Sequence, residues 1–483
     1  MTNFKSLATW ALAGLSAGLA VAAPSASPES FKIDKRYVEV RDDITYNVFE
    51  HAETGTKLSF VNNSGICETT PGVNQYSGYL TVGTNMNMWF WFFEARNNAS
   101  TAPLATWFNG GPGCSSMIGL FQENGPCQFY NGASEPSLNP YSFNEYANMI
   151  YVDQPIGTGF SYGTDTVTST VTAAPFVWKF LQAFLTQFPQ YESRDFGIFT
   201  ESYGGHYGPE FANYIETQNK AIDSGSVSGE KLNLVALGIN NGLYDESIQY
   251  KADIEFAYNN TYRKLITAAQ YTSLNKAYTS SCKPLVDKCT GLTGNDAYCE
   301  KAYNTCDADI DEVIYSSANF DPYDVRAARN DPNPPETYAT YLARADVKKA
   351  IGAATTYQEC PNSVNSKFFT TGDYPRSLVS TLSTVVQSGI RVLTWAGDAD
   401  FICNWFGNLD VANALTYDGS TEFNAKALAA YTVDGTEMGQ FKSVDNLSFI
   451  RVYGAGHEVP YYQPKLALQA FTQTMKGEAV SST

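Results

Sequence analysis

Strand-like runs alternate with longer helical segments over most of the chain, and this alternation restricts the folds that the chain can adopt. The runs are short and rich in β-branched and aromatic residues, and segment 172–189 between two of them has the apolar periodicity of a helix. Such alternation is typical of an α/β layer fold with a mostly parallel sheet. The predicted strands are 87–95, 148–155, 195–201, 232–240, 390–398 and 448–456.

One long interval, about 256–345, interrupts this rhythm. It holds four cysteines and many Tyr and Asp residues. We interpret it as a mainly helical insertion that is stapled by disulfides and stands over the sheet. A chain of 483 residues is long enough for one large domain or two ordinary ones.

The first residues have the pattern of a targeting segment. Residues 8–22 form an apolar run that ends in small residues at Ala20 and Ala22. The run is too short to cross a bilayer comfortably, so 1–22 is predicted to be a secretory signal peptide. A short pro-segment, 23–36, would end at the dibasic pair Lys35-Arg36, although that pair could also be a chance occurrence. The mature chain would be 37–483.

Charge and hydropathy exclude two classes of partner. The formal net charge is −18, whereas nucleic-acid binding requires a basic face. No second apolar span follows the leader, and the C-terminus lacks the hydrophobic tail of a lipid-anchor signal. We therefore expect a secreted, extracellular protein without a membrane anchor.

The nine cysteines should form disulfides in an oxidising compartment, and the odd count leaves one of them over. The four between Cys282 and Cys306 could be a zinc site, but the secretory context favours two local disulfides and no metal. Four sequons mark surface positions that could carry glycans, namely Asn62, Asn98, Asn259 and Asn446.

The stretch 195–209 has the pattern of a strand, a tight turn and a helix. At the apex of such an elbow, Ser202 would be exposed over the top of the sheet. The usual motif is G-x-S-x-G, and here Thr200 replaces the first glycine while Gly204 occupies the second position. Alone, the stretch could equally be a serine in a glycine-rich turn.

A nucleophilic serine needs a base, and the chain has three histidines. In this fold the order along the chain is Ser, Asp, His, which favours His457, in a glycine-rich loop after a strand. His51 precedes the elbow. His206 lies four residues after Ser202, so it should point away from the nucleophile and serve in packing.

Two further pieces complete the pattern. Asp398 and Asp400 follow an apolar strand, and either could orient the imidazole, because spacing alone does not choose between them. Consecutive glycines in 106–116 would present bare backbone N–H groups to an oxyanion, and the N–H of Tyr203 would be the second donor.

Six motifs together resemble the serine carboxypeptidases of the α/β-hydrolase fold, most closely the secreted fungal branch. They are WFNGGPGCSS, VDQPIGTGFSY, ESYGGHYGP, INNGLYD, GDADFICNW and GAGHEVP, and they run over nearly the whole mature chain. The resemblance implies a single catalytic domain that releases single amino acids from peptide and protein C-termini at acidic pH, through an acyl-enzyme and without a cofactor.

The resemblance also implies a role for individual residues. The catalytic triad would be Ser202, Asp400 and His457, with an oxyanion hole at Gly111 and Tyr203. The substrate's terminal carboxylate would be bound by a set that we call the carboxylate clamp: Asn109, Gly110, Glu123 and Glu201. Cys403 would be the free thiol, and the disulfides would be Cys67–Cys127, Cys114–Cys360, Cys282–Cys306 and Cys289–Cys299.

The resemblance explains why a glutamate, Glu201, stands directly before Ser202. Two glutamates held close cannot both ionise easily, so one keeps a proton at mildly acidic pH and donates it to a substrate carboxylate. The chain departs from the family at Thr200 and at Glu458, where relatives often have Met. An esterase or lipase, an acyltransferase and a catalytically inactive binding protein are the alternatives, and only the first two keep the triad in use.

Overall fold

In the computed structural model of this chain, residues 35–51, 56–130, 132–329 and 334–483 are described. The predicted signal peptide and residues 23–34 lie outside this range. Lys35 and Arg36 begin the first strand, β1 (Lys35–Arg41), and both are exposed.

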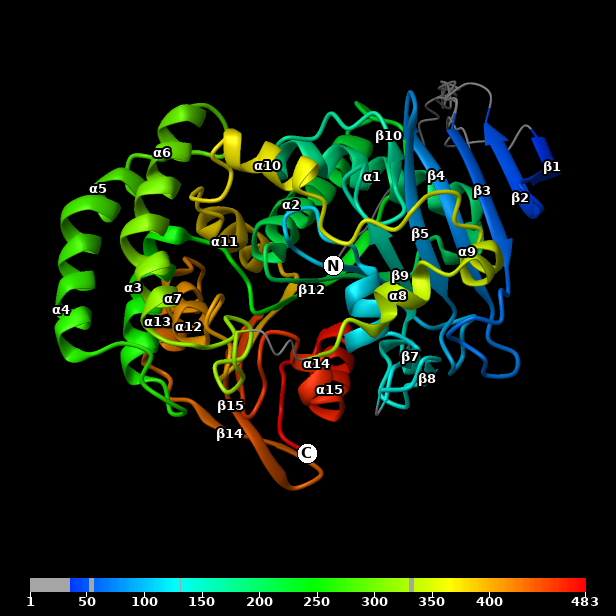
Figure 1. The fold of residues 1–483 in the computed structure, drawn as a ribbon. Coiled ribbons are helices and arrows are strands. Elements are labelled where there is room, and N and C mark those ends of the chain that lie inside the picture. Colours follow the sequence, from blue (N-terminus) through cyan, green and yellow to red (C-terminus); the bar gives the residue numbers. More distant parts are fainter. Residues whose placement is uncertain (1–34, 52–55, 131, 330–333) are drawn as a thin grey trace, which may run out of the picture.

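A single large sheet organises the molecule, and its centre is parallel (Figure 1). The central strands run parallel in the spatial order β9 (Asn148–Asp153), β6 (Leu104–Phe108), β11 (Asp195–Glu201), β12 (Asn233–Asn240), β13 (Arg391–Gly397) and β16 (Leu447–Val452). The parallel centre confirms the predicted α/β class. Each strand predicted from sequence is present, with ends within a few residues of the predicted ones.

Antiparallel strands extend the sheet on both sides, and of these the sequence analysis predicted only the one at 87–95. Beyond β9 lie β5 (Met86–Phe93), β4 (Gln75–Gly83), β3 (Thr56–Asn62), β2 (Ile44–His51) and β1, and β10 (Tyr162–Gly163) pairs with β5. Beyond β16 lie β15 (Thr436–Val444) and β14 (Ala429–Val433). A separate pair is formed by β7 (Cys127–Gln128) and β8 (Ser137–Leu138).

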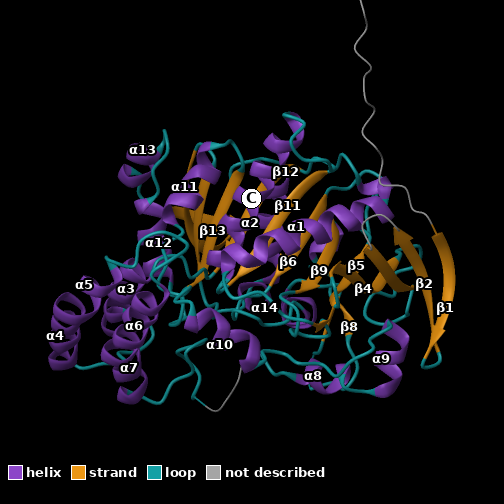
Figure 2. Cartoon of the chain, turned by 90° about the horizontal axis from the view of Figure 1, so that it is seen from above, coloured by secondary structure: helices purple, strands orange, loops and turns teal. Residues whose placement is uncertain are grey.

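The hydrophobic core lies in two layers, one on each face of the sheet. Alternate residues of β5 point to opposite faces, so that Phe90 and Phe92 join one layer while Trp89 and Trp91 join the other. Figure 2 shows the helices around the sheet. The first layer is covered by α1 (Thr170–Gln187), α2 (Gly204–Asp223) and α11 (Val379–Gln387), and the second by α15 (Pro464–Met475).

The chain between β12 and β13 is mainly helical, as predicted. Its helices are α3 (Glu246–Asn259), α4 (Ala268–Ala277), α5 (Lys283–Val286), α6 (Asp296–Cys306), α7 (Glu312–Ser317), α8 (Thr337–Leu342), α9 (Ala345–Ile351), α10 (Asn362–Thr370) and α11. α3 to α7 share a core of their own that includes Ile254, Leu274 and Ile310. Disulfides Cys282–Cys306 and Cys289–Cys299 staple this region.

Besides α15, three helices follow β13, namely α12 (Trp405–Ala414), α13 (Ser420–Ala425) and α14 (Val459–Tyr462). In the described part of the chain, no helix combines the length and the apolar character that a bilayer crossing needs.

Candidate active site

Ser202 lies at the sharp turn between β11 and α2. Its φ of +62° falls in the left-handed region, which non-glycine residues rarely adopt and which is frequent at functional turns. Three backbone hydrogen bonds hold the turn: the Ser202 N–H donates to Asn240 O, and Ser202 O accepts from the N–H groups of Gly205 and Leu243. The strained position is therefore fixed from both sides.

Thr200 occupies the elbow without disturbing it. Its hydroxyl donates to Gly204 O over 2.9 Å. A Cβ added at Gly204 would lie 2.4 Å from Thr200 Cβ, so the glycine after Ser202 makes room for the threonine before it. The departure from G-x-S-x-G is thus accommodated within the turn.

His457 and Asp400 meet at the carboxyl ends of β16 and β13. His457 Nδ1 lies 2.9 Å from Asp400 Oδ2, and that oxygen also accepts from Asn241 Nδ2 and the Cys403 N–H. Burial acts to lower the pKa of His457, but the negative charge and hydrogen bond of Asp400 outweigh it and raise the pKa. The pairing occupies Nδ1, so Nε2 is the ring atom left for proton exchange.

The structure separates the two candidate acids. Asp398 accepts hydrogen bonds from Arg451, Tyr262 and the Gly454 N–H. Asp400 is the one that contacts His457. Spacing had left this choice open.

His206 has a packing role, as expected. It is fully buried, its Nδ1 lies 2.6 Å from Leu243 O, and its ring stacks on Tyr203 at 4.4 Å. His51 ends β2 in the antiparallel flank, six strands from β11 in the sheet order.

A glycine loop after β6 approaches the elbow closely. A Cβ on Gly110 would lie 2.4 Å from Tyr203 N, so only glycine lets the two backbones meet here. Gly111 has a φ of +106°, which also favours glycine. Disulfide Cys114–Cys360 ties this loop to the segment before α10.

Asn109 holds two glutamates beside the elbow. Its Oδ1 accepts from Trp107 Nε1 and from the Gly119 N–H, which fixes the amide orientation. Its Nδ2 donates to Glu123 Oε1 at 3.2 Å and to Glu201 Oε1 at 3.1 Å. Glu123 ends the π-helical turn η1 (Gly119–Glu123), and both carboxyl groups are buried.

Glu123 has the electrostatics of a protonated acid. Burial, the charge of Glu201, a hydrogen bond with Glu201 and the charge of Glu458 all hold the pKa of Glu123 well above its ordinary value. Burial and the same Glu201 charge raise the pKa of Glu458 well above its usual range. The site therefore presents three neighbouring carboxyl groups, and burial and mutual repulsion disfavour the ionised forms of Glu123 and Glu458.

Several of these groups line one cavity of about 400 Å³, whereas Glu123 is fully buried and is not part of its lining. The residues that line it include Ser202, His457, Gly111, Asn109, Glu201 and Glu458. Three further lining residues, Asp321, Tyr323 and Glu336, come from the helical interval, about 256–345. The helical interval therefore forms part of the wall over the nucleophile.

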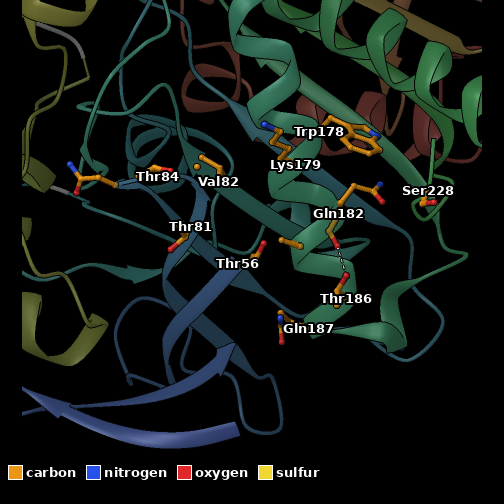
Figure 3. Close-up of a pocket in the computed structure, with 13 residues that line it drawn as sticks. Thr56, Thr81, Val82, Thr84, Trp178, Lys179, Gln182, Thr186, Gln187 and Ser228 are labelled. Atoms are coloured by element: carbon orange, nitrogen blue, oxygen red, sulfur yellow. Dashed lines mark hydrogen bonds between the residues drawn. The ribbon is translucent and has the colours of Figure 1, made fainter. Parts of the chain in front are cut away.

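A larger cavity of about 560 Å³ lies elsewhere, between α1 and the strands β3 and β4 (Figure 3). Of the described residues that line it, Lys179 is the only ionisable one, and its neighbours there include Trp178, Gln182 and Thr81. This cavity offers no acid–base pair for acyl transfer.

The remaining predicted site residues are placed as follows. The four disulfides are Cys67–Cys127, Cys114–Cys360, Cys282–Cys306 and Cys289–Cys299, and Cys403 is a buried free thiol. Asn62, Asn98 and Asn259 are exposed, whereas Asn446 is half-buried. Among the described residues, no cluster of His, Cys, Asp and Glu is arranged to hold a metal ion.

Two asparagines were missed by sequence reasoning. Asn240 contacts Glu201, and Asn241 contacts Asp400. The available signal was a polar Asn-Asn pair directly after the apolar run of β12, at the edge where the other catalytic candidates lie. Which acid each amide would reach depends on strand register, which the sequence does not reveal.

Known proteins are similar to this chain in sequence. A family model described as serine carboxypeptidase matches residues 65–477. Carboxypeptidase S1 of Penicillium janthinellum is 66% identical over 424 residues, which cover 88% of this chain and 100% of that protein. Carboxypeptidase Y of Schizosaccharomyces pombe is 37% identical over 422 residues, which cover 84% of this chain and 41% of that protein.

A solved structure supports the fold. The crystal structure of Kex1(Δ)p, a prohormone-processing carboxypeptidase from Saccharomyces cerevisiae, matches with a TM-score of 0.72 at 24% identity, covering 85% of this chain and 94% of that one. With the parallel sheet and the elbow, this match confirms the predicted α/β-hydrolase fold.

Proposed function

This chain belongs to the serine carboxypeptidase family, and from that premise we propose that it is a secreted enzyme that removes single amino acids from peptide and protein C-termini in acidic media. The observation that carries the proposal is the buried glutamate pair, Glu123 and Glu201, joined by Asn109. Asn109 and Glu201 line the same cavity as Ser202 and His457. An esterase or lipase would not need such a group.

We assign the chemistry to a triad of Ser202, His457 and Asp400. His457 Nε2 takes the Ser202 hydroxyl proton as Oγ attacks the scissile carbonyl carbon, and the Gly111 and Tyr203 N–H groups stabilise the resulting oxyanion. His457 then protonates the departing amine, which leaves an acyl-enzyme. Water, deprotonated by the same imidazole, releases the shortened peptide and restores Ser202. No step requires a cofactor.

Asp400 has two tasks in this scheme. Its bond to Nδ1 fixes the tautomer in which Nε2 can accept a proton, and its charge stabilises the imidazolium that forms. The donors from Asn241 and Cys403 hold the carboxylate in place for this purpose.

The carboxylate clamp gives the exopeptidase selectivity. While the pair keeps a proton, its protonated carboxyl donates a hydrogen bond to the terminal carboxylate, with Asn109 and the Gly110 N–H as the other donors. When pH rises and the second proton leaves, two glutamate charges repel the substrate carboxylate. Peptide binding should therefore weaken toward neutral pH, whereas esters and amides, which lack a free carboxylate, should be less affected.

Secretion fits the four disulfides and the exposed sequons, since disulfides persist in oxidising compartments. We propose signal peptide 1–22, pro-segment 23–36 and one catalytic domain, 37–483, with the insertion 256–345.

The proposal is tested by incubating the secreted protein with an N-blocked dipeptide and measuring the free C-terminal amino acid, with Ser202→Ala as the matched control. Release by the wild type and none by the variant is the expected result. Hydrolysis of simple esters without any release from peptides would instead favour an esterase or acyltransferase.

A further inference from the structure

We infer that one loop of the helical interval, residues 320–327, positions both catalytic partners of Ser202, and that Arg326 is the positioning residue that holds this loop in place. We call the segment the positioning loop. The inference rests on the triad of the proposed function and goes beyond it, because the loop supplies neither the nucleophile nor the base nor the acid.

Asp400 and His457 lie on two separate loops, one after β13 and one after β16. The two loops touch, since the Ala399 N–H donates to Ala455 O at 2.8 Å. Loops are less firmly held than the strands that they follow. The bond between His457 Nδ1 and Asp400 Oδ2 therefore depends on whatever fixes the two loops relative to each other.

The positioning loop holds the Asp400 loop through its backbone. The Val325 N–H donates to Ala399 O at 2.8 Å. Pro322 O accepts from the Phe401 N–H at 3.0 Å. The residues directly before and after Asp400 are thus both bonded to the positioning loop, so the carboxylate between them is held from both sides.

The same loop holds the base. The His457 N–H donates to Tyr323 O at 2.9 Å. A Cβ added at Gly456 would lie 2.5 Å from that oxygen, so the glycine allows the two backbones to approach. The Tyr323 ring packs against the imidazole in a T-shaped arrangement, with the ring centroids 5.1 Å apart. Backbone and ring of His457 both contact the positioning loop.

Arg326 ties the positioning loop to the turn that leads to His457. Its Nη1 donates to Gly454 O at 2.9 Å. Its Nε and Nη2 donate to the two carboxylate oxygens of Asp324 at 2.8 and 2.6 Å. Asp324 is buried, and this paired contact fixes the plane of the guanidinium in which Nη1 reaches Gly454.

The positioning loop is closed on itself, which suits it to act as a support. The Asp321 N–H donates to Ala327 O at 3.1 Å, and the Ala327 N–H donates to Asp324 O at 2.9 Å. The Asp321 carboxylate accepts from the Tyr323 N–H at 2.9 Å. These bonds within the loop fix the spacing between its contacts to the two catalytic loops.

Charged groups from three elements face His457, and one of them belongs to the positioning loop. Burial acts to lower the pKa of His457, whereas the charges of Asp400, Glu201 and Asp321 raise it, and the net shift is upward. If the base moves away from these charges and meets water, both influences weaken. Its pKa then falls toward the ordinary value of 6.5.

Arg326→Lys should weaken the support and keep a positive charge beside Asp324. A lysine ammonium cannot reproduce the planar, three-donor contact of the guanidinium. The base should be displaced slightly, so kcat should fall about tenfold for an N-blocked dipeptide and for its ester alike. The rising limb of kcat/KM for the ester should shift to lower pH by a few tenths of a unit.

The carboxylate clamp should not respond to this change. In the described part of the chain, the hydrogen bonds of the positioning loop do not reach Asn109, Glu123 or Glu201. The preference for the dipeptide over its C-terminal amide, and the pH dependence of that preference, should therefore stay as in the wild type. General loosening of the site would alter this preference as well.

A second variant and a control accompany Arg326→Lys. Asp324→Asn keeps the shape of the partner but removes its charge, so it should move kcat and the rising limb in the same direction by a smaller amount. Arg344→Lys is the matched control, because Arg344 Nε and Nη2 donate to the two oxygens of Asp346 at 3.1 and 2.6 Å on the exposed surface. It should change neither quantity. The amplitude of thermal unfolding gives the amount of folded enzyme.

The outcomes separate the two claims. Ester and peptide hydrolysis that survive in Ser202→Ala overturn the proposed function. If that variant is inactive while Arg326→Lys keeps the wild-type kcat and rising limb, the inference alone is overturned. A fall in kcat with an unmoved limb, or an equal effect in Arg344→Lys, also overturns it and leaves Arg326 a structural residue.

Amide hydrogen exchange of the wild-type enzyme covers the case in which neither variant folds. The N–H groups of Val325, Phe401 and His457 should share one free energy of opening, because each is released only when the positioning loop leaves the two catalytic loops. A His457 N–H that exchanges through a much easier opening than the Val325 N–H would contradict the inference.

Discussion

Two buried acid pairs flank Ser202, and they differ in what each acid is paired with. On one side Asp400 contacts His457, so a negative group meets a base that can become positive. On the other side Glu123 meets Glu201, so two groups that can become negative share one site. Both pairs are buried. Burial therefore strengthens attraction in the first pair and repulsion in the second.

The two pairs respond to pH in opposite ways. The raised pKa of His457 means that the base becomes available as pH rises. The raised pKa of Glu123 means that the clamp is competent while pH is still low enough to keep its proton. Peptide hydrolysis should therefore follow a bell-shaped pH profile, while ester hydrolysis should keep only the rising limb.

Breaking the base pair should have the largest effect. Asp400→Asn removes the charge that holds the imidazole tautomer, and kcat should fall on the order of 10⁴-fold for peptides and esters alike. Single-turnover and steady-state rates on both substrates test this. A loss confined to peptides would contradict the assigned role.

Breaking the clamp should affect peptides selectively. In Glu123→Gln/Glu201→Gln, an amide donor replaces the stronger acid–carboxylate bond, so KM for a dipeptide at low pH should rise about tenfold. The pH dependence of that KM should disappear because neither amide ionises. An unchanged pH dependence would show that the glutamate pair does not govern peptide binding.

Glu458 offers a finer adjustment of the same pair. Its charge contributes to the raised pKa of Glu123. In Glu458→Gln that contribution is lost, so the clamp proton leaves at lower pH. The falling limb of the pH profile for peptide hydrolysis should therefore shift to lower pH by a few tenths of a unit. Profiles of kcat/KM for the free acid and the ester of one peptide measure the shift, and an upward shift would refute it.

Glu210 lies outside the catalytic cavity, so its ionisation should change the stability of the fold and not the activity. Burial, with the charge of Asp373, raises the pKa of Glu210 to about 7. The stability that comes from its protonation is present below its ordinary pKa near 4.5 and is lost as pH rises through about 7. Glu210→Gln should therefore reduce the loss in free energy of unfolding between pH 5 and pH 8 by on the order of 1 kcal/mol. The ratio of peptide to ester hydrolysis should stay unchanged.

The sequence predicted the parallel centre well because those strands are buried on both faces and read as continuous apolar runs. It also predicted the elbow and placed Ser202 and His457 at the ends of the right strands. Apart from β5, the antiparallel flanks were missed, and β1 shows why, since it is almost wholly exposed and has little apolar signal.

Other features depend on contacts that spacing does not encode. Spacing does not distinguish Asp398 from Asp400. The family resemblance implied Asp400, and in the folded chain their partners, Arg451 and His457, separate the two. Asn240 reaches Glu201 because of the register between β11 and β12. Register and side-chain partners are properties of the folded chain.

The central claim is that a protonated glutamate pair beside Ser202 recognises a free C-terminal carboxylate. The most direct test measures kcat/KM for an N-blocked dipeptide and for its C-terminal amide at about pH 4.5 and about pH 7.5, on either side of the range where paired carboxyls lose their last proton. The ratio of acid to amide cancels the titration of His457, which both substrates share. The account predicts a ratio that falls strongly from the lower to the higher pH, and a ratio that stays constant would contradict it.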